Sequence, residues 1–143
     1  MNFFLKFCIF LSLILGNLFF SQNSDLSIVA FQGIPGQYTN DKNYEILKKA
    51  GFTVNLHMYK NISEVKKALD LCEKCDLKLI FSINDFAAHL DSYISQVKDH
   101  PALLGYYIED EPNADRFSEL NKIVKKIYSL DKKHITYINL YPN

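Results

Sequence analysis

The sequence predicts an α/β fold: a parallel sheet covered by helices, built as an incomplete barrel of the (β/α)8 type. Strand-like and helix-like segments alternate strictly, which favours a parallel sheet with helices outside it. Polar residues gather on one face near the strand ends, whereas an open sheet covered on both faces should be apolar on both. The 143 residues hold about five strands, while a complete barrel needs roughly 200 residues or more.

The composition excludes several classes of protein. Hydrophobic residues make up 48% of the sequence and aromatic residues 14%, which is incompatible with a disordered or low-complexity chain. The 16 Lys and Arg residues balance the 16 Asp and Glu residues. The chain therefore lacks the basic surplus with which a dedicated nucleic-acid-binding protein meets phosphates, and we expect no nucleic-acid partner.

Residues 1–22 predict a secretory signal peptide. Lys6 precedes the apolar run 7–20, and polar residues follow it. This run of about 14 residues is shorter than the roughly 20 that span a bilayer, which favours cleavage over an uncleaved membrane anchor. We expect an exported protein, periplasmic or secreted, with no stable membrane span after cleavage and a single domain over residues 23–143.

Five short runs rich in apolar and β-branched residues predict strands. In order, they are residues 26–31, 52–59, 77–84, 103–109 and 134–141. No glycine-rich phosphate loop follows any of them, which lowers the odds of an open nucleotide-binding sheet, the competing architecture.

Four segments between the strands predict helices because their apolar residues recur at helical spacing. In order, they are residues 41–50, 61–75, a broken region over 85–97, and 117–128. Thr39, Asn40 and Asp41 are suitable caps for the first helix and Asn61 for the second, and Glu64 completes a capping box with Asn61. Gly51 is a typical helix stop.

Cys72 and Cys75 have the spacing of a metal half-site or a redox pair, and export would place them in an oxidising compartment. They also continue the helical series of Val65, Ala68 and Leu69, which favours burial. The sequence has no second CxxC or His pair to complete a zinc site. Core packing is the favoured interpretation, with a disulfide and a metal site as alternatives.

Strand alternation predicts where polar side chains meet. In the second strand His57 and Tyr59 share a face, and in the fourth Tyr107, Glu109 and Glu111 share one if no bulge intervenes. In a β/α barrel the catalytic residues lie at the C-terminal ends of the strands. The polar residues at those ends are Gln32, His57, Tyr59, Asn84, Asp85, Glu111, Asn139 and Tyr141.

Three consecutive acids, Glu109, Asp110 and Glu111, end the fourth strand, and Pro112 stops it. Packed together they repel one another, so at least one pKa should rise. A carboxylic acid that stays protonated near neutral pH can act as a general acid. The alternative is a solvated acidic loop in which Asp110 helps to cap the next helix.

The segment HPALLGYYIEDEPN, residues 100–113, and the later YINLYPN, residues 137–143, resemble exported (β/α)8-barrel glycoside hydrolases of the large retaining clan, GH-A. The resemblance covers the N-terminal half of such a barrel. It implies hydrolysis of O-glycosidic bonds in a carbohydrate substrate, with Glu111 as the general acid/base. Asp110 stands where the clan usually has Asn. Asp110, Asn139, Tyr141, Asn84, His57 and Tyr59 would bind the sugar, and Tyr107 is a further candidate for stacking.

A retaining enzyme needs a second carboxylate roughly 5–5.5 Å from the acid/base. In the resembled clan it comes from the seventh strand, and this sequence has five. Glu109 and Asp85 are candidates only by proximity. We therefore expect the chain to be inactive alone and its partner to be the missing C-terminal half of the barrel. No cofactor and no metal are expected.

Two other interpretations stay open. One is an exported noncatalytic carbohydrate-binding or interaction module of α/β type. The other is an open-sheet protein with a metal or small-molecule site, whose ligands would be His57, His89, Glu109 and Asp110. Their spacing fits no common metal-binding pattern.

Overall fold

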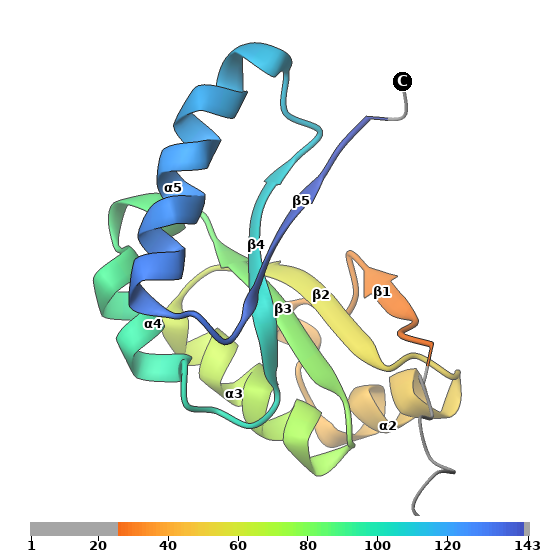
Figure 1. Ribbon diagram of the computed structural model, residues 1–143. Helices are drawn as coiled ribbons and strands as arrows, with labels where there is room; N and C mark the ends of the chain where they lie inside the picture. Colours follow the sequence, from red (N-terminus) through yellow and green to blue (C-terminus); the bar gives the residue numbers. More distant parts are fainter. Residues whose placement is uncertain (1–25, 142–143) are drawn as a thin grey trace, which may run out of the picture.

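A computed structural model describes residues 26–141, which form a five-stranded parallel sheet with its helices on one side (Figure 1). The strand order β1-β2-β3-β4-β5 follows the sequence, and each neighbouring pair is parallel. The sheet curls into a half-barrel, with β1 and β5 at its two edges. The predicted fold class, an incomplete parallel β/α barrel, is confirmed. The predicted signal peptide lies outside the described residues.

The predicted alternation of strands and helices is present with small shifts in the ends of each element. The strands are β1 Val29–Phe31, β2 Val54–Tyr59, β3 Lys78–Ile83, β4 Leu103–Asp110 and β5 Ile135–Asn139. The α-helices are α2 Asp41–Lys49, α3 Ile62–Lys74, α4 Leu90–Val97 and α5 Phe117–Leu130. Three short 3-10 turns precede α2, α4 and α5, namely η1 Gly36–Tyr38, η2 Phe86–Ala88 and η3 Ala114–Arg116.

The helix caps follow the predicted chemistry. The Asn40 side chain accepts the backbone N–H of Asn43 at 3.0 Å, and that of Asn61 accepts the N–H of Glu64 at 3.0 Å. The Glu64 carboxylate reaches back to the N–H of Lys60 at 3.1 Å, one residue before the expected partner. These bonds satisfy amide groups that a helix leaves unpaired at its start. Gly51 ends α2 with a φ of 90°.

The main core lies between the sheet and the helices. Tyr59, Phe81 and Tyr106 project into it from three neighbouring strands, and Phe81 meets Tyr106 edge-on at 5.7 Å. The helices contribute buried aliphatic side chains: Val65, Ala68, Leu69, Ile94, Val97 and Ile127. Full burial of a Leu or Phe side chain contributes roughly 1.5–3 kcal/mol, so this layer holds the helices on the sheet.

The opposite, concave face carries a smaller apolar cluster. Val54, Leu56, Ile80 and Tyr107 are buried there, and Phe31 meets Tyr107 edge-on at 6.0 Å. Around this cluster, apolar side chains at the two sheet edges and at the end of β2 are exposed to solvent in residues 26–141. The exposed apolar side chains there are Val29, Phe31, Met58 and Ile135.

A β-bulge in β4 changes which side chains face inward. Tyr107 pairs with Tyr137, but the next pairs are Glu109 with Ile138 and Asp110 with Asn139. β4 therefore contains one extra residue, Ile108. The prediction that Glu109 shares the face of Tyr107 is wrong because the bulge reverses the alternation after Tyr107.

A hydrogen-bonded network lies at the N-terminal end of β5. The buried Asp131 carboxylate accepts the Tyr106 hydroxyl at 2.6 Å, and the Nδ1 atom of His134 lies 2.6 Å from the same oxygen. The backbone N–H of Lys133 donates to the other oxygen at 2.9 Å. The network ties β4, the end of α5 and the start of β5 together.

Cys72 packs in the main core, which confirms the favoured interpretation for that residue, and Cys75 is partly buried at its edge. Both thiols are free. Within residues 26–141, no helix has the length and apolar character needed to cross a membrane.

Candidate functional site

The candidate site is a polar cluster at the C-terminal ends of β4 and β5. The Asn139 side-chain amide donates to Oδ1 of Asp110 at 2.8 Å, across the two paired strands. The backbone N–H of Glu111 donates to the Asn139 carbonyl oxygen at 2.7 Å. The bulge brings Asp110 and Asn139 to one face, so the structure brings together three of the predicted site residues.

Glu111 lies immediately beyond β4 and is exposed. Its φ is 48°, in the left-handed region that a non-glycine residue seldom adopts. Such strained backbone is a recurrent property of functional residues because neighbouring contacts must hold it in place. Here the bond to Asn139 and the following Pro112 fix the backbone on both sides of the Glu111 carboxylate.

Tyr141 lies beside Glu111. Hydrogen bonding to the Glu111 carboxylate, together with its negative charge, raises the pKa of the Tyr141 hydroxyl. Its side chain is 65% exposed, so one face of the ring is open to a ligand. Tyr141 therefore joins Glu111, Asp110 and Asn139 in the cluster.

Tyr107 lies beneath this cluster on the concave face. Its ring is buried, and its hydroxyl makes no hydrogen bond of good geometry among the described residues. Burial raises its pKa, and the nearby Asp110 carboxylate raises it further. A buried ring offers no face to a sugar, so the structure does not favour Tyr107 as a stacking residue.

Glu109 is separated from its two acidic neighbours. Nε of Arg116 donates to one of its carboxylate oxygens at 3.2 Å, and Nη2 donates to the other at 2.9 Å. Hydrogen bonding to Arg116 lowers the pKa of Glu109 although partial burial opposes the shift. The expectation that crowding raises a pKa in the acidic run is therefore reversed at Glu109.

His57 and Tyr59 lie on the helix-covered face of β2, away from the cluster. The Tyr59 hydroxyl is buried and bonds to the Ile34 carbonyl oxygen at 3.3 Å and to the Asn55 side-chain amide at 3.0 Å. Burial lowers the pKa of His57. The prediction that this face of β2 lines the barrel interior is wrong because Val54 and Leu56 face inward instead.

Asn84 lines a cavity of about 270 Å³ between the ends of β2, β3 and β4 and the start of α5. The polar lining residues are Ser82, Asn84, Glu109, Arg116 and Glu119. Met58 and Ile108 contribute apolar surface. The cavity has the mixed lining of a small-molecule site and lies at the end of the sheet where barrel ligands bind.

Asp85, the other candidate nucleophile, binds residues that follow it closely in the chain. It accepts the Tyr93 hydroxyl at 3.0 Å, and His89 lies 3.4 Å from its other oxygen. Residues 26–141 contain no group of three or more side chains placed to hold a metal ion. The residues of the metal interpretation are dispersed, since His57 lies beside Tyr59 of the main core and Glu109 binds Arg116.

Arg116 is the site residue that sequence reasoning missed. It follows Glu109 by seven positions across a turn that contains Pro112, so no helical or strand period connects the two. The only available signal was a lone Arg close to three acids. Gln32, the first of the predicted strand-end residues, has a φ of 56° and ends β1 at the edge of the sheet.

No family model and no curated protein matches this chain. Several solved structures are similar to this chain. Two of them are glycosyl hydrolase family 2 members from Bacteroides cellulosilyticus, one from strain DSM 14838. Their TM-scores are both 0.56, with 15% and 16% sequence identity, and each covers 80% of this chain. The chain spans only 18% of the length of either, and at this identity the likeness shows a shared fold.

Proposed function

We propose that this chain is the N-terminal half of an exported β/α-barrel enzyme that hydrolyses O-glycosidic bonds, with Glu111 as its general acid/base. The observation that carries the proposal is the position of Glu111. It follows β4 directly, beside the bonded pair Asp110 and Asn139, in a half-barrel that has the fold of part of two glycosyl hydrolases. In barrel enzymes this end of the strands is the catalytic end.

In this proposal the Glu111 carboxyl group donates its proton to the glycosidic oxygen as the bond to the leaving group breaks. Asp110 and Asn139 bind sugar hydroxyl groups. The Asp110 oxygens accept hydrogen bonds only, and one already accepts from Asn139, so Asp110 selects a hydroxyl that donates to it. The exposed ring of Tyr141 provides a stacking surface for the sugar.

The second carboxylate would come from the other half of the barrel. Glu109 is held by Arg116 and Asp85 by Tyr93, so neither is proposed as the nucleophile. The proposed partner is therefore the C-terminal half, in the same polypeptide or as a separate chain.

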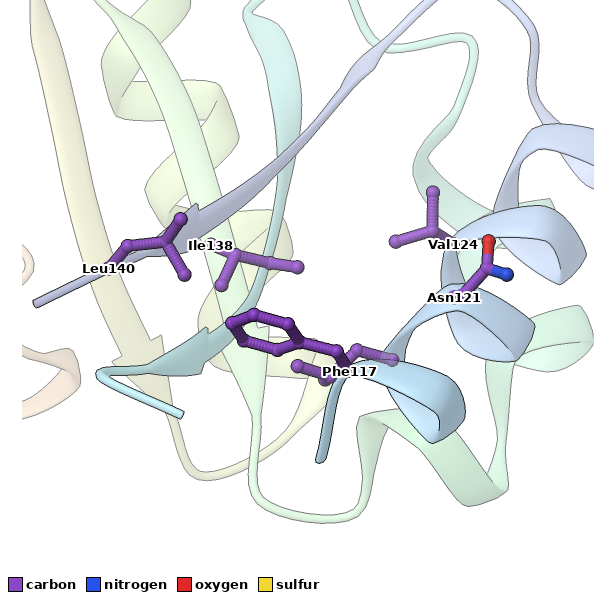
Figure 2. A pocket seen from close by; sticks show the side chains of 6 residues that line it. Phe117, Asn121, Val124, Ile138 and Leu140 are labelled. Carbon is purple, nitrogen blue, oxygen red and sulfur yellow. The ribbon is translucent and has the colours of Figure 1, made fainter. Parts of the chain in front are cut away.

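Three surfaces of the described residues support a partner of this kind. β1 and β5 each have one edge without a neighbouring strand. The concave face has exposed apolar margins, including Phe31 and Ile135. A third surface is the apolar groove of about 290 Å³ between α5 and the end of β5 (Figure 2). A further β/α unit after β5 would cover the free β5 edge, Ile135 and the groove, and the last strand of a closed barrel would pair with β1.

Figure 2 shows how the groove is built. Phe117 and Val124 extend from α5 toward Ile138 and Leu140 of the β5 segment, and the space between them is open. Phe117 and Leu140 are about half exposed. Exposed apolar side chains that line one groove are typical of a protein–protein interface.

The test uses the complete gene product and its Glu111→Gln variant. We expect the variant to lose roughly 10²–10⁴-fold in rate on substrates with poor leaving groups and far less on activated aryl glycosides, which need no proton. Glu45→Gln, an exposed carboxylate on α2, is the matched control. Equal losses on both substrates would contradict the acid role. Hydrolysis by residues 23–143 alone would contradict the half-barrel proposal.

The alternative function, a noncatalytic carbohydrate-binding module, is favoured by the cavity that Ser82 and Asn84 line. Ser82 lies on β3 and Asn84 follows its end, so neither residue depends on a second barrel half for its position. Titration of the chain with oligosaccharides, followed by NMR, separates the two functions. Binding that persists in Glu111→Gln but disappears in Asn84→Ala would favour the module.

A further inference from the structure

We propose that Arg116 is a positioning residue: by holding Glu109 on the helix-covered face of the sheet, it sets the β4 bulge and thereby aims Asp110 and Glu111. The inference rests on the proposed function only in naming Glu111 as the acid. The geometry on which it depends is independent of any reaction.

The register of β4 decides which acids face inward. Without a bulge, alternation would put Glu109 and Glu111 on the face of Tyr107 and turn Asp110 toward the helices. The extra residue, Ile108, reverses this arrangement and pairs Asp110 with Asn139. The bulge therefore selects which of three consecutive acids enters the site.

The ion pair between Glu109 and Arg116 holds the bulge in place. Both carboxylate oxygens of Glu109 accept from Arg116, and this two-pronged geometry is stronger and more directional than a single contact. Arg116 also pairs with Glu119 in the first turn of α5. The Arg116 guanidinium therefore binds a carboxylate of β4 and one of α5, and it holds the Glu109 side chain next to the start of α5.

The same ion pair encloses Glu111 in the chain. Glu109 and Arg116 stand at the two ends of the turn from β4 to α5, and Glu111 lies between them with its φ of 48°. Ion pairs of two exposed residues usually contribute little to stability. The expected effect of this pair is on geometry: it closes the turn and maintains the Glu111 to Asn139 bond.

Tyr141 provides a readout that a merely stabilising ion pair would not change. The adjacent Glu111 carboxylate raises the pKa of Tyr141, so the tyrosine titration reports where Glu111 lies. The experiment follows the 13Cζ resonance of Tyr141 against pH, assigned with Tyr141→Phe. Side-chain amide resonances of Asn139 report its bond to Asp110.

The variants are Arg116→Gln and, as the matched control on the following helix α5, Lys126→Gln, which removes the Lys126–Asp91 pair. We expect Arg116→Gln to shift the Tyr141 pKa down toward its ordinary value and to change the Asn139 amide resonances. Lys126→Gln should change neither. A folded Arg116→Gln chain with both signals unchanged would overturn the proposal.

If Arg116→Gln fails to fold, Arg116→Lys decides the question. Lys keeps the charge but cannot donate from a planar fork to both oxygens. We expect a smaller downward shift of the Tyr141 pKa, and an unchanged titration would overturn the proposal. None of these measurements requires sugar turnover, so they stand or fail separately from the glycosidase assay.

Discussion

Replacing Asp131 by Asn tests the hydrogen-bonded network at the N-terminal end of β5. The pKa of Asp131 sets the size of the stability change to expect. Burial alone would raise the pKa of this carboxyl group, but hydrogen bonds from Tyr106, His134 and the Lys133 backbone outweigh burial and lower the pKa to about 2. The ordinary value is 3.8. Asn keeps the shape of the side chain and removes the charge.

The difference between the two pKa values sets the expected loss. Each pH unit corresponds to 1.36 kcal/mol, so the ionised carboxylate contributes roughly 2 kcal/mol to the free energy of unfolding at pH 7. Since the pKa is depressed in the folded state, this contribution is complete above pH 3.8 and disappears as the pH falls through about 2. The variant cannot ionise here and lacks the contribution at every pH.

The assay is urea denaturation followed by circular dichroism at pH 7, 5, 3 and 2. We expect Asp131→Asn to be less stable by roughly 2 kcal/mol at pH 7 and the gap to shrink by about half at pH 3. Asp91→Asn, which removes an exposed ion pair with Lys126, should change stability by about 0.5 kcal/mol or less. A gap that stays constant down to pH 2 would refute the reasoning.

Three further predictions follow from other contacts. Tyr59→Phe removes a buried hydroxyl bonded to Asn55 and Ile34, so we expect urea denaturation to show a loss of about 1–3 kcal/mol while sugar titrations stay unchanged. Gly105→Ala places a Cβ 2.4 Å from the Ile135 carbonyl oxygen, so the melting temperature should fall by several degrees; an unchanged value would contradict this close approach. Burial raises the pKa of Cys72 to about 12, so iodoacetamide at pH 8 should label Cys75 first and Cys72 only in urea, as peptide mass spectrometry can show.

The sequence was sufficient for the fold because its signals are local. Asn40, Asn61 and Gly51 act within one turn of the chain, and the apolar period of each helix reports its buried face directly. The strand order then follows from the alternation, since each β/α crossover is right-handed and places the next strand beside the last.

The inward and outward faces were harder to predict. In β2, Asn55 shares the polar face of His57 and Tyr59, and it is fully buried, where its side chain accepts the Ile34 N–H at 2.8 Å and donates to Tyr59. A polar residue that binds a loop and one that binds a ligand have the same pattern in a sequence. The two kinds of residue are distinguished only by the group to which the side chain is hydrogen-bonded in the structure.

The acidic run shows a different limit. Strand alternation is reliable only while the ladder is regular, and one inserted residue in β4 exchanged the roles of Glu109 and Asp110. Glu111 stayed at the strand end in either register. Its assignment to the catalytic end therefore depended on the Pro112 stop and on the resemblance, and neither is sensitive to the bulge.

The order of the sheet has a consequence for biosynthesis. Every strand pairs with the strand that precedes or follows it in the chain, so each strand of residues 26–141 finds a partner one β/α unit away. Parallel strands pair across a helix and therefore form slowly, but chains fold from the N-terminus as they leave the ribosome. The half-barrel can thus assemble strand by strand during synthesis. β5 is the last of these strands to pair, and its free edge is then available to a further strand.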